Sequence, residues 1–227
     1  MLLSSSPAHP VALAAIALVS GTLASGCAFT EIALHPPPAS AMNVGPTVGG
    51  GIGRGREVVL AGPLADVRLD PSRCGMKKNG YNMDTADIHC AVPPPQWLTQ
   101  ALADGLHSAG FVVTAAPSSP APAAYINGQV VQFFVEPKVG FFSFNPEADI
   151  AVTLTVSTSN GVVADRRFYW KAVHGAALGT DDVFQAATDE ATLEAVRGMV
   201  VAIAALLDRY PAAVAANAPL AMGGALR

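Results

Sequence analysis

Two cysteines and several acidic and imidazole side chains lie close together in the sequence CGMKKNGYNMDTADIHC, residues 74–90. A metal ion could take ligands from Cys74, His89 and Cys90, with an aspartate as the fourth ligand. The segment lacks the Cys-x-x-Cys or His-x-x-x-His spacing that brings such ligands together, so we expect no metal and no cofactor. A disulfide between Cys74 and Cys90 that staples a polar loop in an oxidising compartment is favoured, and free thiols remain the alternative.

Hydrolytic chemistry would need a nucleophile held beside an oriented base. The candidate bases are His107, on the polar face of an expected helix, and His174, just beyond an expected strand. The sequence contains no Gly-x-Ser-x-Gly nucleophile elbow. We therefore expect no catalytic residue and no enzyme activity. A hydrolase stays an alternative, which a pocket joining either histidine to an acid and a hydroxyl would favour.

Five residues are candidates for contact with a protein partner. Asp66 and Arg68 are two positions apart on one expected strand, so they point to the same side and form either an ion pair or part of a binding surface. The expected loop PKVGFFSFNPE contributes three aromatic rings, those of Phe141, Phe142 and Phe144. Exposed rings would mark a partner or membrane contact, whereas the alternative is a loop that folds over the core.

An apolar run near the start of the sequence predicts a cleaved signal peptide over residues 1–26. The run is about 14 residues long, which suits a signal core and is shorter than the roughly 20 residues of a spanning helix. The stretch LASGC, residues 23–27, resembles the bacterial lipobox, so Cys27 is the expected lipidated residue. Lipid on Cys27 would leave Cys74 and Cys90 as an even pair. The alternative is an ordinary secreted protein cut after Gly26.

Composition limits the class of partner and the organisation of the chain. The 227 residues carry a formal net charge of −4 and only 13% charged side chains, with no basic stripe to hold phosphates, so nucleic acid is not an expected partner. Prolines and glycines predict a flexible tether over residues 27–56, after the lipidated cysteine. One domain is expected over residues 57–210, followed by an Ala-rich, disordered tail over residues 211–227.

Hydrophobic periodicity predicts the elements that must position these side chains. Strands are expected at residues 57–70, with a break at Pro63, and at 111–116 and 123–137, the last ended by Pro137. A hairpin is expected over residues 149–173, and helices over 93–110 and 181–209. These elements predict an α/β (α+β) two-layer sandwich, with a mixed sheet of about five strands and two helices on one face.

The segments ADVRLD, WLTQALADGLHSAGF and LLDRY, in this order along residues 57–210, resemble the YajG-like family of bacterial envelope lipoproteins. They resemble more loosely the auxiliary lipoproteins of envelope ABC transporters. The resemblance implies an envelope protein with no established chemistry, and residues 74–90 depart from the family's pattern. Ala28 after Cys27 is similar to lipoproteins that are passed to the outer membrane, with the domain in the periplasm.

We therefore expect a lipid-anchored protein that acts as a binding or accessory subunit of an envelope assembly or transport machine. Its expected partners are the membrane, through the lipid, and a protein of the cell envelope. The alternatives are a hydrolase, as above, and a small-ligand carrier, which a large apolar cavity would favour.

Overall fold

The computed structural model describes residues 29–48, 51–118, 124–140, 144–158, 163–175 and 180–209. Within these residues the chain forms one mixed sheet of nine strands, three α-helices and a short 3-10 helix. The strands are β1 (Ile32–Leu34), β2 (Glu57–Val59), β3 (Ala65–Asp66), β4 (Gly75–Lys78), β5 (Asp84–Cys90), β6 (Val112–Thr114), β7 (Ala124–Val139), β8 (Phe144–Ser157) and β9 (Val163–Val173). The helices are η2 (Ala39–Met42), α2 (Gly45–Val48), α3 (Pro94–Ser108) and α4 (Asp181–Arg209).

Strand β7, 16 residues long, organises the sheet. Along one edge it pairs antiparallel with β8, which in turn pairs antiparallel with β9. Along its other edge it pairs in parallel with three short strands in succession, β2, β3 and β4. Strand β6 extends the sheet beside β2, and β5 and then β1 extend it beside β4. The expectation of about five strands is wrong because the short strands carry too few residues to show an alternating pattern.

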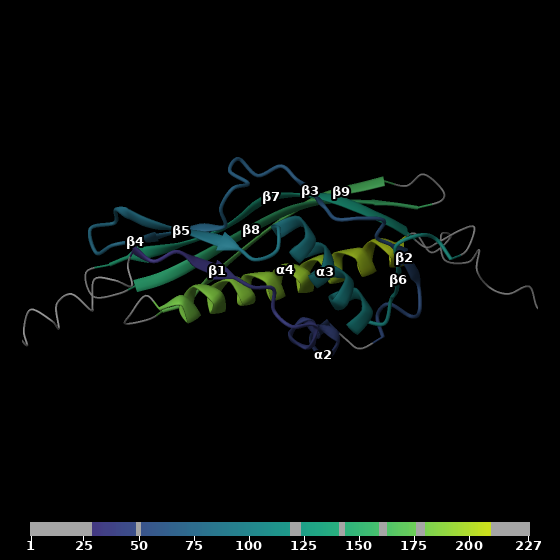
Figure 1. Cartoon of the computed structure of the whole chain (residues 1–227). Helices are drawn as coiled ribbons and strands as arrows, with labels where there is room; N and C mark the ends of the chain where they lie inside the picture. Colours follow the sequence, from purple (N-terminus) through teal and green to yellow (C-terminus); the bar gives the residue numbers. More distant parts are fainter. Residues whose placement is uncertain are drawn as a thin grey trace, which may run out of the picture.

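Both long helices cover one face of the sheet, as expected (Figure 1). Alternate residues of β8 point to this face and are buried, namely Ile150, Val152, Leu154 and Val156. Helix α4 packs across β8 and β9, with α3 beside it. The sequence also predicted how α3 ends: Gly110 has φ +88° and Phe111 folds back into the core. The opposite face carries polar side chains and is called the open face below.

The flexible tether predicted for residues 27–56 is wrong for the part of that range that the structure describes. Strand β1 pairs with β5, and Met42 and Val44 are buried in the main hydrophobic core. The amide of Val44 donates a hydrogen bond to Ser108 Oγ at the end of α3. Nearer the first predicted strand, buried Arg56 forms a 2.8 Å ion pair with Asp208 of α4. This segment is therefore part of the fold.

Two other expectations are corrected in the same region of the sheet. Residues 74–90, expected as a polar loop, form the antiparallel hairpin of β4 and β5. Strand β7 does not end at Pro137: it continues to Val139, and Pro137 lies opposite Pro146 in the ladder with β8. The predicted strand over residues 57–70 is divided into β2 and β3, with Pro63 between them, and it is wrong over residues 67–70, which follow the end of β3 at Asp66. The signal peptide over residues 1–26 and the tail over residues 211–227 lie outside the described residues.

Replacing Met42 by alanine tests the new place of the N-terminal segment. Removal of a fully buried methionine side chain leaves a cavity, so we expect Met42→Ala to lower the free energy of unfolding by about 2–5 kcal/mol. A side chain on a solvated tether would change stability by less than about 0.5 kcal/mol. Chemical denaturation of the wild type and the variant measures the difference. The exposed neighbour Asn43 offers a matched control, Asn43→Ala.

Candidate functional site

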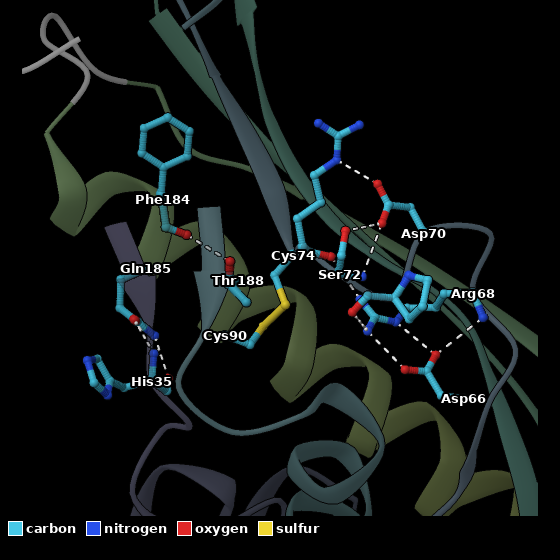
Figure 2. Close-up of a disulfide and its surroundings, with 12 residues drawn as sticks. His35, Asp66, Arg68, Asp70, Ser72, Cys74, Cys90, Phe184, Gln185 and Thr188 are labelled. Atoms are coloured by element: carbon cyan, nitrogen blue, oxygen red, sulfur yellow. Dashed lines mark hydrogen bonds and ion pairs between the residues drawn. A yellow bond between two sulfur atoms is a disulfide. The ribbon is translucent and has the colours of Figure 1, made fainter. Parts of the chain in front are cut away.

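The connection between β3 and β4, residues 67–74, is held together by the buried guanidinium of Arg68 and is called the β3–β4 loop. The Arg68 side chain is 4% exposed. Its Nε and Nη2 donate to the two carboxylate oxygens of Asp66, each at 2.9 Å. Its Nη1 and Nη2 also donate to the carbonyls of Arg73 and Pro71, each at 3.0 Å (Figure 2). The Arg68 side chain thereby joins the start of the loop, at Asp66, to its far half, at Pro71 and Arg73.

A second set of hydrogen bonds fixes the far half of the loop. The Asp70 carboxylate accepts from the amide and hydroxyl of Ser72. It also accepts from Arg73 Nε at 2.8 Å. These bonds, those from Ser72 first, hold the pKa of the Asp70 carboxyl below its ordinary value. Arg73 Nη1 reaches Asp87 Oδ1 on β5 at 3.2 Å, which ties the loop to the next strand.

The disulfide between Cys74 and Cys90 lies at the end of this loop, as the sequence predicted. It joins the residue before β4 to the last residue of β5, with Cα atoms 5.7 Å apart (Figure 2). The amide of Cys74 donates to the Ile88 carbonyl, and the Cys74 carbonyl accepts from the amide of Val135 on β7. The loop therefore ends on a residue fixed both covalently and by the sheet.

This rigid loop presents apolar side chains to solvent. Leu69 is fully exposed at 103% of its reference area, and Val67 is 46% exposed. Figure 1 shows the loop rising from the side of the sheet away from α3 and α4. Single exposed apolar side chains are common on protein surfaces. Leu69 differs because the residues on both sides of it are fixed by side-chain hydrogen bonds.

The open face next to the loop carries a row of alternating charges across β4, β7, β8 and β9. Glu136 and Glu147 are direct neighbours in the β7–β8 register, and lysines separate their charges. Lys78 and Lys138 contact Glu136 at 2.5 and 2.7 Å. Lys171 contacts Glu147 at 2.6 Å, and this hydrogen bond raises the pKa of Lys171 to about 12. Burial would raise the pKa of Glu136, but its two lysines outweigh burial and lower it. The charges of the row are therefore paired with one another.

A shallow hollow of about 340 Å³ lies on the open face beside β3. It is lined by Ala65, Asn127, Gly128, Gln129, Thr153, Thr155 and Asp165, five of which have polar side chains. It therefore lacks the large apolar side chains that would favour a small-ligand carrier, and neither histidine proposed as a base contributes to it. Nε2 of His174 lies 2.7 Å from a carboxylate oxygen of Glu190 instead, and both side chains are substantially exposed. His107 is exposed near the end of α3.

The residues expected to contact a partner have different outcomes. Asp66 and Arg68 form the ion pair, and the Arg68 guanidinium is buried and makes its hydrogen bonds within the β3–β4 loop. Phe144 is half-buried and meets Phe184 of α4 edge-on, with ring centroids 5.6 Å apart, so it packs on the core and is not an exposed tip. Phe141 and Phe142 lie outside the described residues, as does Cys27. Among the described residues, no group of three or more histidine, cysteine or acidic side chains could hold a metal ion.

Sequence reasoning missed Leu69, the residue that the loop presents. The available signal was the sequence DVRLDPSR, residues 66–73, in which aspartates precede Arg68 and Ser72 by two positions each. Aspartate in such a position often accepts hydrogen bonds from the backbone two residues later. The pattern thus indicated an ordered turn. The alternation of Val67 and Leu69 with charged residues favoured a strand instead, and this is why Leu69 was missed.

Comparison with protein families places the chain in the class of lipoproteins. The family described as "Uncharacterized lipoprotein" matches residues 63–199, more than half of the chain. The protein belongs to this family, and the resemblance to YajG-like lipoproteins seen in the sequence is confirmed. No curated protein matches the chain. Within the described part of the chain, none of the helices combines the length and the apolar character needed to cross a membrane.

Solved structures with a similar arrangement are distant. A Xanthomonas campestris protein is 14% identical, over 69% of this chain and 87% of its own, with a TM-score of 0.49. PelC of Paraburkholderia phytofirmans, solved as a dodecamer, is 13% identical over 65% of this chain and 88% of its own, with a TM-score of 0.37. A Neisseria meningitidis lipoprotein is 11% identical over 69% of this chain and 99% of its own, with a TM-score of 0.31. No functional argument follows from scores this low.

Replacing Asp66 by alanine tests how far the β3–β4 loop depends on its central ion pair. The buried guanidinium of Arg68 would keep only two carbonyl acceptors, so we expect Asp66→Ala to lower the free energy of unfolding by about 1.5–3 kcal/mol at neutral pH. Asp84→Ala, at an exposed position of β5, serves as the control and should change stability little.

The pH dependence of this difference provides a second readout. Hydrogen bonds from Arg68 hold the pKa of Asp66 below its ordinary value of 3.8, although burial opposes them. Because the folded-state pKa is lowered, the carboxylate stabilises the fold above that value and stops doing so as the pH falls through the folded-state pKa. Urea denaturation should therefore show wild type and Asp66→Ala converging in strong acid. A constant difference at all pH values would contradict the ion-pair explanation.

Proposed function

We propose that the protein is a lipoprotein anchored to the outer membrane through lipid on Cys27, with its domain in the periplasm, and that it acts by binding another envelope protein. Membership of a lipoprotein family supports the anchor, as does the lipobox-like sequence at residues 23–27. Two acyl attachments on one cysteine are an adequate anchor, since a single chain gives only marginal membrane binding.

The exposure of Leu69 on a rigid loop is the observation that carries the binding role. A loop that is already ordered loses little conformational entropy when a partner covers it. Burial of one leucine side chain contributes about 1.5–3 kcal/mol, so Leu69 can act as an anchor residue in a larger interface. The hydrogen bonds of Arg68 and Asp70 maintain the loop shape in the free protein. The role of a binding or accessory subunit in an envelope machine agrees with this geometry.

A catalytic role receives less support from the same side chains. The contact between His174 and Glu190 lies on an open surface, with exposed fractions of 39% and 52%. Such exposure leaves the pair solvated, whereas an active site needs a shaped cavity that orients substrate and excludes water. The open-face charges are neutralised by one another, and the Arg68 guanidinium is committed to the loop.

Loss of the proposed anchor is tested at Cys27. Serine cannot accept the thioether-linked lipid, so we expect Cys27→Ser to move the protein from the membrane fraction to the soluble fraction. Cell fractionation and metabolic labelling with a clickable fatty acid measure the change. Cys27→Ser should keep the melting temperature of the domain. Wild-type protein that carries no label and is fully soluble after export would remove the proposed anchor.

Contact at Leu69 is tested by a photo-crosslinking amino acid in living cells. At position 69 we expect a covalent adduct of defined mass with one envelope protein. At Val201, an exposed position on α4, we expect none. Excess unlabelled wild-type protein, added before irradiation, should reduce formation of the adduct, whereas excess Leu69→Ser protein should not. Equal crosslinking at positions 69 and 201 would contradict a specific contact through the β3–β4 loop.

A further inference from the structure

Thr30, three positions after Cys27 in the sequence, already contacts the folded domain. The carbonyl of Thr30 accepts a 3.1 Å hydrogen bond from Lys77 Nζ of β4. Lys77 is buried, and its Nζ also lies 3.3 Å from Asp181 at the start of α4. Because an extended chain advances at most about 3.6 Å per residue, the Cα atom of Cys27 lies within about 11 Å of that of Thr30. Any lipid on Cys27 is therefore attached next to the folded domain.

One end of the sheet lies beside this attachment point. Strand β1 runs parallel to β5, with Ile32 opposite Ile88. The residues that precede Ile32 therefore lie beside the start of β5, next to the turn that joins β4 to β5. Figure 1 shows the start of the described chain and this turn at the same end of the molecule. Phe29 is 64% exposed there, and Tyr81 and Met83 of the turn are 86% and 55% exposed.

The turn is built to hold these side chains outward. The Asn79 side-chain oxygen accepts from the amides of Tyr81 and Met83, at 2.9 and 3.1 Å. The amide of Asn79 donates to the Met83 carbonyl, and Asn82 takes the left-handed conformation with φ +61°. The turn thus exposes a tyrosine and a methionine while its backbone groups are satisfied within the turn.

We propose that Phe29, Tyr81 and Met83, together called the membrane tip, lie against the phospholipid bilayer that receives the lipid of Cys27. This inference rests on the proposed lipid anchor. The occupant is a bilayer because the acyl chains leave the protein within a few residues of the tip. Tyrosine rings, which are apolar with one polar end, favour the membrane–water interface. The lipid supplies the attachment, and the tip fixes how the domain stands on the surface.

Tryptophan fluorescence in vesicles of brominated phosphatidylcholine tests the proposal. The full-length lipidated protein is reconstituted as wild type, as Tyr81→Trp and as Val112→Trp, the last being an exposed position on β6 at the other end of the sheet. The wild type supplies the background of Trp97, which is buried, and Trp170. We expect brominated acyl chains to quench the emission added at position 81 and to leave the emission added at position 112 unchanged, relative to vesicles without bromine.

Mass spectrometry of the same preparations separates this proposal from the anchor on which it rests. Lipid on Cys27 with no quenching at position 81 overturns the membrane tip and leaves the anchor intact. Quenching at both positions also overturns it, because the domain would then have no fixed orientation. Absence of lipid on Cys27 overturns both proposals. Equal melting temperatures of the three proteins show that the exposed substitutions left the fold unchanged, and Tyr81→Phe, which keeps the ring, should retain wild-type partitioning.

Discussion

The hydrogen-bond ladder along β7 is the constraint on which the rest of the structure depends. One edge of this 16-residue strand is filled by β8, and the other edge is shared by β2, β3 and β4. Asp66 of β3 pairs with Val130 of β7, and Gly75 of β4 pairs with Val135. Between these two pairs the chain must advance about 16 Å along β7. It does so with eight residues, 67–74, which is more than the distance requires. The surplus forms the β3–β4 loop, and Arg68 fills the inside of that loop.

Long elements with a strong local pattern could be predicted from the sequence. The alternation from Ile150 to Val156 identified β8, and the spacing of apolar residues identified α3 and α4, because each pattern repeats over several turns or pairs. The cysteine count indicated the bond between Cys74 and Cys90. The spacing of Asp66 and Arg68 indicated an ion pair, since both residues belong to one short segment.

Features that depend on distant partners could not be predicted. Strands of two to four residues, such as β3 and β4, form because they pair with the edge of β7. Their own sequences are too short to predict this pairing. The segment before residue 57 has the composition of a linker, yet Met42 and Val44 are buried in a core that includes residues of the distant helices α3 and α4. The exposure of Leu69 follows from the buried hydrogen bonds of Arg68, which composition does not reveal.

The same covalent and hydrogen-bonded path connects the proposed membrane attachment to the proposed partner loop. It runs from Thr30 through β1 to β5, across the disulfide from Cys90 to Cys74, and so to the β3–β4 loop. Strand β4 separates Cys74 from the turn at Asn79 by five residues, or roughly 17 Å. If the tip rests on the bilayer, Leu69 stands at a fixed height above it, within reach only of a partner held at a matching height. A disulfide close to that loop is then useful beyond stability, because it keeps the distance from membrane to partner constant.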